Sequence, residues 1–234
     1  MWTRKELKDK GKAAFKRNYW LCVLAAFIQM VLIGMSGSTS KSESIKSSIK
    51  KIMLNINSIA DQIGVSEDVI IGILVCIFSI AFMIVFVINI FAKNPLLLGS
   101  DRFFLVNTRK PATIKEIIYS FTSGRYFTIV GTMFLKELFI TLWTMLLIVP
   151  GIIKAYEYRM VDYILADEPE LGVMDTLRRS KEMMQGQKWN AFVLDLSFIG
   201  WQFLDAITLG IVGIFYVNPY VQATNAELYL TLKK

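Results

Sequence analysis

The chain of 234 residues contains no histidine and only two cysteines. Histidine is the commonest general base and metal ligand, so its absence removes the usual starting point for catalysis or metal binding. Cys22 and Cys76 both lie in apolar segments, where we expect small hydrophobic side chains rather than a disulfide or a metal pair. No nucleophile–base pair is apparent either. We therefore expect no enzyme activity, no cofactor and no metal site.

Apolar residues are in excess, at 54% of the chain, and they are clustered. Residues 69–92 carry no ionisable side chain, and about 20 such residues in a helix cross the hydrocarbon core of a bilayer. The predicted fold class is all-α, a multi-pass transmembrane helical bundle of about six spans with interfacial amphipathic helices. The predicted spans are residues 19–35, 69–92, 127–149, 151–166, 190–205 and 208–229. Pro150-Gly151 predicts a tight reversal, Asn218-Pro219 a kink, and no internal repeat is evident.

Residues 1–18 predict a basic amphipathic helix at the membrane interface, opened by the capping box Thr3–Glu6. Its apolar residues, which can face the bilayer, are Trp2, Leu7, Ala14 and Phe15. A basic start followed by an apolar stretch also fits a cleaved signal peptide, although the basic region is long for one.

Three of the connections between the spans are long enough for structure of their own. Residues 41–65 carry isoleucines at helical spacing, which predicts an extracytoplasmic amphipathic helix or, as the alternative, a partner-binding helix. Residues 93–126 predict a basic cytoplasmic loop with one short helix after the capping box Thr113–Glu116. Residues 167–189 predict a second cytoplasmic loop containing an amphipathic helix at 173–185, ended by Gly186.

The lysines and arginines predict the orientation. With six spans, 19 of them fall on the side of the two termini and four on the other side, where acidic residues balance them. The positive-inside rule then places both termini in the cytoplasm of a bacterial cell, with the chain in the cytoplasmic membrane. The net charge of +7 is spread along a membrane edge, which favours anionic lipids, and other membrane proteins as possible partners, over nucleic acid. The predicted lipid contacts are Arg4, Lys5, Lys8, Lys12, Lys16 and Arg17.

Several ionisable and polar side chains fall inside the predicted spans, where exposure to lipid is costly. This candidate intramembrane polar cluster consists of Lys136, Glu137, Glu157, Arg159, Asp162, Asp195, Asn218, Gln222 and Asn225. We predict that Lys136 pairs with Asp162 or Asp195, and Glu137 with Arg159. Helical spacing puts Lys154 on the face of Glu157, and Arg159 on the face of Asp162. One interpretation is a structural pairing network, and the other is a site or path for an ion, a lipid headgroup or a small polar substrate.

Several motifs resemble a family of integral membrane proteins of bacteria such as Firmicutes, known as domain of unknown function 975. They are RKELK at residues 4–8, NYW at 18–20, VPGIIKAY at 149–156, YILAD at 163–167, LRRSKEMM at 177–184 and DLSFIGW at 195–201. The chain is more distantly similar to the membrane domain of some glycerophosphodiester phosphodiesterases, whose catalytic domain this sequence lacks. Gly172 stands where related chains favour a serine cap. The resemblance implies a multi-pass bundle and no established function.

These observations together favour a non-enzymatic scaffold or accessory protein of the cell envelope. The alternative is a small transporter or lipid-handling protein that uses the polar cluster. A water-accessible cavity at the cluster favours transport, and a tight pairing network favours structure.

Overall fold

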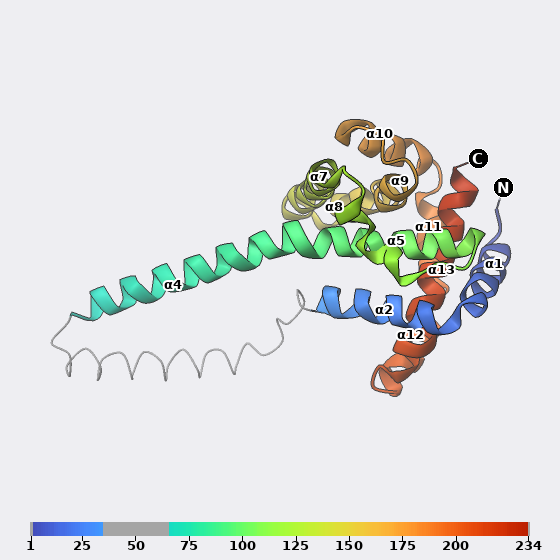
Figure 1. The fold of residues 1–234 in the computed structure, drawn as a ribbon, viewed down its shortest axis with the longest axis horizontal. Coiled ribbons are helices and arrows are strands. Elements are labelled where there is room, and N and C mark those ends of the chain that lie inside the picture. Colours follow the sequence, from blue (N-terminus) through green and yellow to red (C-terminus); the bar gives the residue numbers. More distant parts are fainter. Residues whose placement is uncertain (1, 35–65, 234) are drawn as a thin grey trace. The chain divides into compact units, whose positions relative to one another are not determined.

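The computed structural model describes residues 2–34 and 66–233, and in these residues the regular structure is helical without any strand (Figure 1). The predicted all-α class is therefore confirmed. The chain divides into two units, residues 1–32 with 90–234 and residues 33–89, and each is described by itself. The helix predicted at 41–65 lies outside the described residues.

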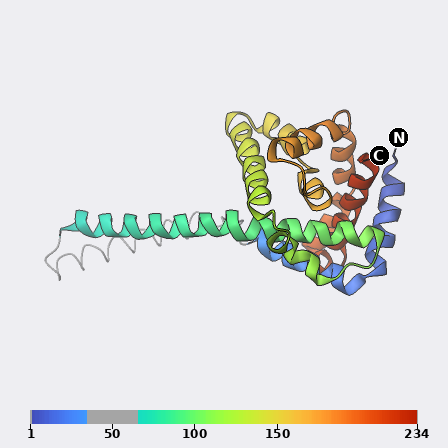
Figure 2. The ribbon, with the colours of Figure 1, turned by 45° about the horizontal axis from the view of Figure 1, so that its top comes forward.

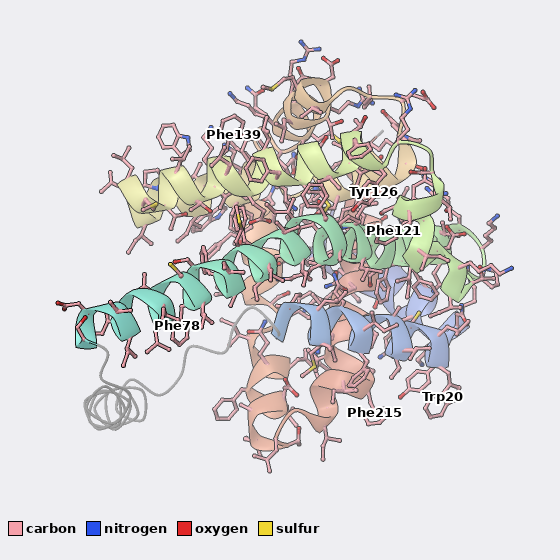
Figure 3. All side chains as sticks on the ribbon, turned by 60° about the vertical axis from the view of Figure 1, so that its left-hand side comes forward. Trp20, Phe78, Phe121, Tyr126, Phe139 and Phe215 are labelled. Carbon is pink, nitrogen blue, oxygen red and sulfur yellow. The ribbon has the colours of Figure 1, made fainter. Side chains whose placement is uncertain are left out.

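Helices α1 (Arg4–Arg17) and α2 (Tyr19–Gly34) begin the first unit. The Thr3 hydroxyl accepts a hydrogen bond from the Glu6 backbone N–H at 3.3 Å, the forward half of the predicted capping box. The two helices meet at an angle of 104°. Trp20, at the start of α2, points outward with 72% of its surface exposed (Figure 3).

Protein and not lipid covers three of the four apolar residues that could face the bilayer, which corrects the sequence-based prediction for them, and the fourth, Trp2, is half-buried. Leu7, Ala14 and Phe15 are at most 2% exposed, because α1 packs along the last helix, α13 (Asn218–Leu232) (Figures 1 and 2). An apolar stripe shows that a helix face is buried but not what covers it.

In the second unit, α4 (Glu67–Ile88) starts after the N-cap residue Ser66. It is apolar on every side, and its labelled side chain Phe78 points outward, 69% exposed (Figure 3). Such a helix is stable only in a non-aqueous environment.

Within the described residues, two helical stretches are long and apolar enough to cross a membrane, Asp68–Arg109 and Tyr126–Leu146. The bent pair of α1 and α2 makes a third if it forms one span. The structure thus contains two or three clear candidates where six were predicted.

Two of the remaining predicted spans are divided into shorter helices, and the last, 208–229, falls on η3 (Gly213–Val217) and α13. Span 151–166 consists of α8 (Ile148–Glu157) and α9 (Val161–Asp167), and span 190–205 of α11 (Lys188–Leu196) and α12 (Ile199–Ile207). At about 1.5 Å per residue, none of these four crosses a bilayer alone.

Helix α7 (Tyr126–Leu146) reverses into α8 at Leu147, three residues before the predicted break at Pro150-Gly151. Gly151 instead lies within α8, where a Cβ atom would come within 2.7 Å of the Thr144 Cα. The absent side chain thus permits close packing of the two helices.

Residues 93–126, predicted as a loop with one short helix, are mostly helical. They contain α5 (Asn94–Arg109), the 3₁₀ turn η2 (Ile114–Ile118) and α6 (Tyr119–Thr122). Leu98, Phe103 and Phe104 of α5 are at most 1% exposed. The arginines of α5 suggested a loop, but they lie on the less buried face of a helix whose other face is in the core.

Other helix contacts complete the first unit. Helix α1 packs on α13, η2 packs on α5, and α10 (Val173–Met183) packs on both α7 and α9. Helices α5 and α13 also begin alike, each with Asn-Pro after a π-helical turn, η1 (Asn89–Lys93) or η3 (Gly213–Val217). The π turn η3 lies directly before Asn218-Pro219, where the sequence predicts a kink.

Candidate functional site

The predicted pair between Lys136 and Asp162 is confirmed. Lys136 on α7 donates from Nζ to both carboxylate oxygens of Asp162 on α9, at 2.7 and 2.8 Å. Lys136 is 8% exposed, so its charge needs this partner. Glu137 is more distant, at 3.8 Å from the same Nζ, and its side chain is 59% exposed.

Arg159 pairs with Asp195, and the prediction that it pairs with Glu137 is wrong. Its two terminal nitrogens donate to the two oxygens of Asp195 at 2.6 and 2.7 Å, a bidentate geometry that fixes both side chains. It also donates to the side-chain oxygen of Asn225 on α13 at 2.8 Å. Tyr156 Oη donates to Asp195 at 2.8 Å. The break between α8 and α9 turns Arg159 away from the face of Asp162, so helical spacing does not apply across it.

Glu157 accepts from two lysines. Lys154 Nζ lies 2.6 Å from one carboxylate oxygen, as predicted, and Lys188 Nζ from α11 lies 2.5 Å from the other. Glu157 is 7% exposed. Its backbone carbonyl also accepts from the Ser180 hydroxyl at 2.8 Å, which attaches α10 to the end of α8.

The polar stripe predicted on the last helix is not one site. Asn225 joins the cluster through Arg159, whereas the side-chain amide of Asn218 contacts Met30 Sδ of α2 at 3.8 Å. Gln222 is half-buried and makes no side-chain hydrogen bond to the described residues. A helical stripe of three residues covers two turns and can meet different neighbours.

The sequence-based prediction missed a buried polar site on α5. Asp101 is 8% exposed and accepts from the Gln29 side-chain amide of α2 at 3.1 Å. The Ser100 hydroxyl, fully buried beside it, donates to the Ala25 carbonyl at 3.3 Å. The sequence signal for this site is Asp101, the one acid in the mostly apolar residues 96–106. It was missed because these residues were predicted to form a loop.

A second missed site is centred on Asp167 at the end of α9. The carboxylate accepts from Arg109 at 2.9 Å with each oxygen, from Lys233 at 2.8 Å and from Tyr229 Oη at 3.1 Å. Burial opposes ionisation, but the hydrogen bonds from Arg109 and Lys233 outweigh it and lower the pKa of Asp167 to about 2. Asp167 thus connects the ends of α5, α9 and α13.

The predicted lipid-contact residues lie on the outer face of α1. Lys8 is half-buried, where its Nζ donates to the Ser197 carbonyl at 2.9 Å and lies 4.1 Å from the centre of the Phe198 ring. Arg17 donates to the Thr108 carbonyl at 3.4 Å. The other four are exposed and make no ion pair with the described residues. They are Arg4, Lys5, Lys12 and Lys16.

In the part of the chain that the structure describes, no three His, Cys, Asp or Glu side chains gather where they could hold a metal ion. Cys22 is buried and Cys76 exposed, and both are free thiols.

No curated protein and no solved structure matches the chain. The model of one family, described as Protein of unknown function (DUF975), matches residues 69–234. The match begins with α4 and includes both partners of each ion pair of Lys136 and Arg159. On this evidence the chain belongs to the DUF975 family of proteins of unknown function.

Proposed function

We propose that this chain is a non-enzymatic scaffold or accessory protein of the cell envelope, embedded in a bacterial cytoplasmic membrane. The observation that carries the proposal is the matching of charges in the polar cluster. Lys136, Arg159 and Glu157 each pair with an opposite charge on another helix at 2.5–2.8 Å. Charges matched at this distance fix the rotation of the helices that carry them, which suits a rigid platform more than a moving carrier.

The proposed topology has six spans with both termini in the cytoplasm. In support, α8 with α9 and α11 with α12 each form two short helices in sequence, and the π turn η3 continues directly into α13. The combined length of each set approaches the length of a span. The start of α1 lies beside the end of α13, as expected if both termini are on the same side of the membrane (Figure 1). A source in Firmicutes, and the distant likeness to the membrane domain of glycerophosphodiester phosphodiesterases, stay predictions.

Transport or lipid handling is the second candidate, and Asp101 favours it. This carboxyl is buried, its hydrogen bond comes from a neutral amide, and no ion pair joins it to the described residues. Acids in such surroundings often carry protons or bind cations in membrane proteins.

A double-mutant cycle separates the two candidates. Arg159→Ala and Asp195→Ala are each expected to lower thermal stability in detergent and abundance in the membrane, because each leaves one charge unmatched. For fully buried pairs the loss is about 3–5 kcal/mol. Here about 1–3 kcal/mol is expected, since the Asp195 side chain is 38% exposed. The double variant should recover part of that loss.

The matched control combines Arg159→Ala with Asp162→Ala, two neighbours that do not pair with each other. Their effects should add without recovery. Suppose instead that both single variants, at Arg159 and at Asp195, keep full stability and abundance but cannot complement the phenotype of a strain that lacks this protein. The structural role of the cluster would then be wrong, and transport or lipid handling would be favoured.

A further inference from the structure

A cavity of about 670 Å³ lies between the start of α1 and α11. The residues of its wall that matter most are Trp2, Arg4, Lys5, Lys8, Trp189 and Asn190. This volume lies in the range of pockets that hold small molecules or headgroups. Trp2 is fixed by a hydrogen bond of 3.0 Å from its Nε1 to Gln187.

The wall of this cavity carries positive charge without compensation. Arg4 and Lys5 are exposed and form no ion pair with the described residues. Lys8 donates only to a neutral carbonyl, that of Ser197, so its charge is not matched either. No Asp or Glu is among the lining residues. The occupant that complements such a wall is an anion.

A second cavity of about 340 Å³ adjoins the first at Trp189, which borders both. Its accessible surface is apolar, and its other lining residues are Ile152, Ile153, Tyr156, Phe192 and Lys188, whose charged end pairs with Glu157. The Trp189 ring lies 5.4 Å from that of Phe192, and the residue is 71% exposed. Tryptophan is typical of the level where headgroups meet hydrocarbon.

We propose that the two cavities together bind one anionic glycerophospholipid. Its phosphate lies among Arg4, Lys5 and Lys8, and one acyl chain follows Ile152, Ile153 and Phe192. The inference rests on the proposed membrane location but goes beyond a general attraction to anionic lipid. Only three of the six predicted lipid-contact cations line the cavity, and Lys12, Lys16 and Arg17 do not.

The test compares two variants with equal loss of charge on the same helix. Arg4→Gln with Lys5→Gln changes the cavity, and Lys12→Gln with Lys16→Gln, equally exposed, does not. Full-length protein in detergent is titrated with dioleoyl phosphatidylglycerol and, separately, dioleoyl phosphatidylcholine, and bound lipid is counted by native mass spectrometry. We expect wild type to prefer phosphatidylglycerol. The cavity variant should bind it roughly tenfold or more weakly, since each cation near an anionic lipid contributes about fivefold, and the control less than twofold.

A second variant, Trp189→Ala, keeps the charge and should also weaken phosphatidylglycerol binding, because it removes the wall shared by both cavities. Equal losses in the cavity variant and its control would overturn the proposal in favour of diffuse electrostatic attraction. Competition by millimolar inorganic phosphate, with no loss in Trp189→Ala, would make the occupant a free anion. Alkaline carbonate tests the proposed membrane location separately, because the lipid titration uses purified protein in detergent. Release of the wild-type protein from membranes by carbonate would contradict the location.

Discussion

Asp167 accepts hydrogen bonds from side chains of α5, α13 and the C-terminal segment, and it thereby connects parts of the chain far apart in sequence. Its pKa is lowered to about 2 from an ordinary value of 3.8, because Arg109 and Lys233 outweigh the effect of burial. Residues of this kind stabilise a fold only while they are ionised.

Asp167→Asn should therefore lower the free energy of unfolding at pH 7 by about 1 kcal/mol, a figure reduced by screening at the half-exposed Arg109. The folded pKa lies below the unfolded one, so this contribution is complete above about pH 4 and disappears as the pH falls through about 2. Unfolding in detergent measured from pH 7 to pH 2 checks it, with Asp175→Asn in an exposed ion pair as the control. A difference from wild type that stays constant down to pH 2 would contradict the assignment.

Prediction of residue pairs succeeded in two cases. One helical turn brings Lys154 to Glu157, and Lys136 was expected to pair with one of two acids and pairs with Asp162. The partner of Arg159 was predicted wrongly. Arg159 lies in the break after α8, and its pairing with Asp195 depends on the rotation of α11, which the spacing of residues along the sequence does not specify.

At the scale of elements, Gly11 shows how closely α1 approaches α13. A Cβ atom at Gly11 would lie 2.8 Å from the Cα and 2.9 Å from the backbone nitrogen of Thr224. Backbone atoms cannot move aside as a flexible side chain does, so any larger residue must separate the two helices.

Gly11→Ala is expected to lower stability by about 1–3 kcal/mol in thermal or chemical unfolding. Gly200→Ala in α12, where nothing lies within 4 Å of the new methyl group, should be neutral or stabilising by up to about 1 kcal/mol. The comparison also tests the position of α1. If that helix lay on lipid instead of on α13, Gly11→Ala would raise helix propensity and stabilise the protein as Gly200→Ala does.

Element boundaries followed from the sequence wherever caps and periodicity agreed. Helices α1, α2, α7 and α10 begin within two residues of the predicted positions. Hydropathy averaged over a span does not register a break, so α8 with α9, and α11 with α12, were each predicted as one helix. Helix α5 was missed because its arginines suggested a loop, although they pair at the rim of a buried helix.

At the scale of the whole molecule, we propose that the cationic ends of the helices share one side of a membrane. The chain has two or three helices clearly able to span, and the proposed six spans would place the termini and residues 93–126 and 167–189 on the cytoplasmic side. Paired charges within the spans, and unpaired cations at the membrane surface, are the distribution expected of a membrane protein.

Cysteine labelling in intact cells tests this claim most directly. In a background with Cys22→Ala and Cys76→Ala, single cysteines replace Asp68, Lys115, Lys181 or Lys233, all in the described part of the chain. A membrane-impermeant maleimide is applied before or after permeabilisation. We expect Asp68→Cys to react in intact cells and the other three to react only after permeabilisation. Labelling of Lys115→Cys, Lys181→Cys or Lys233→Cys in intact cells would contradict it.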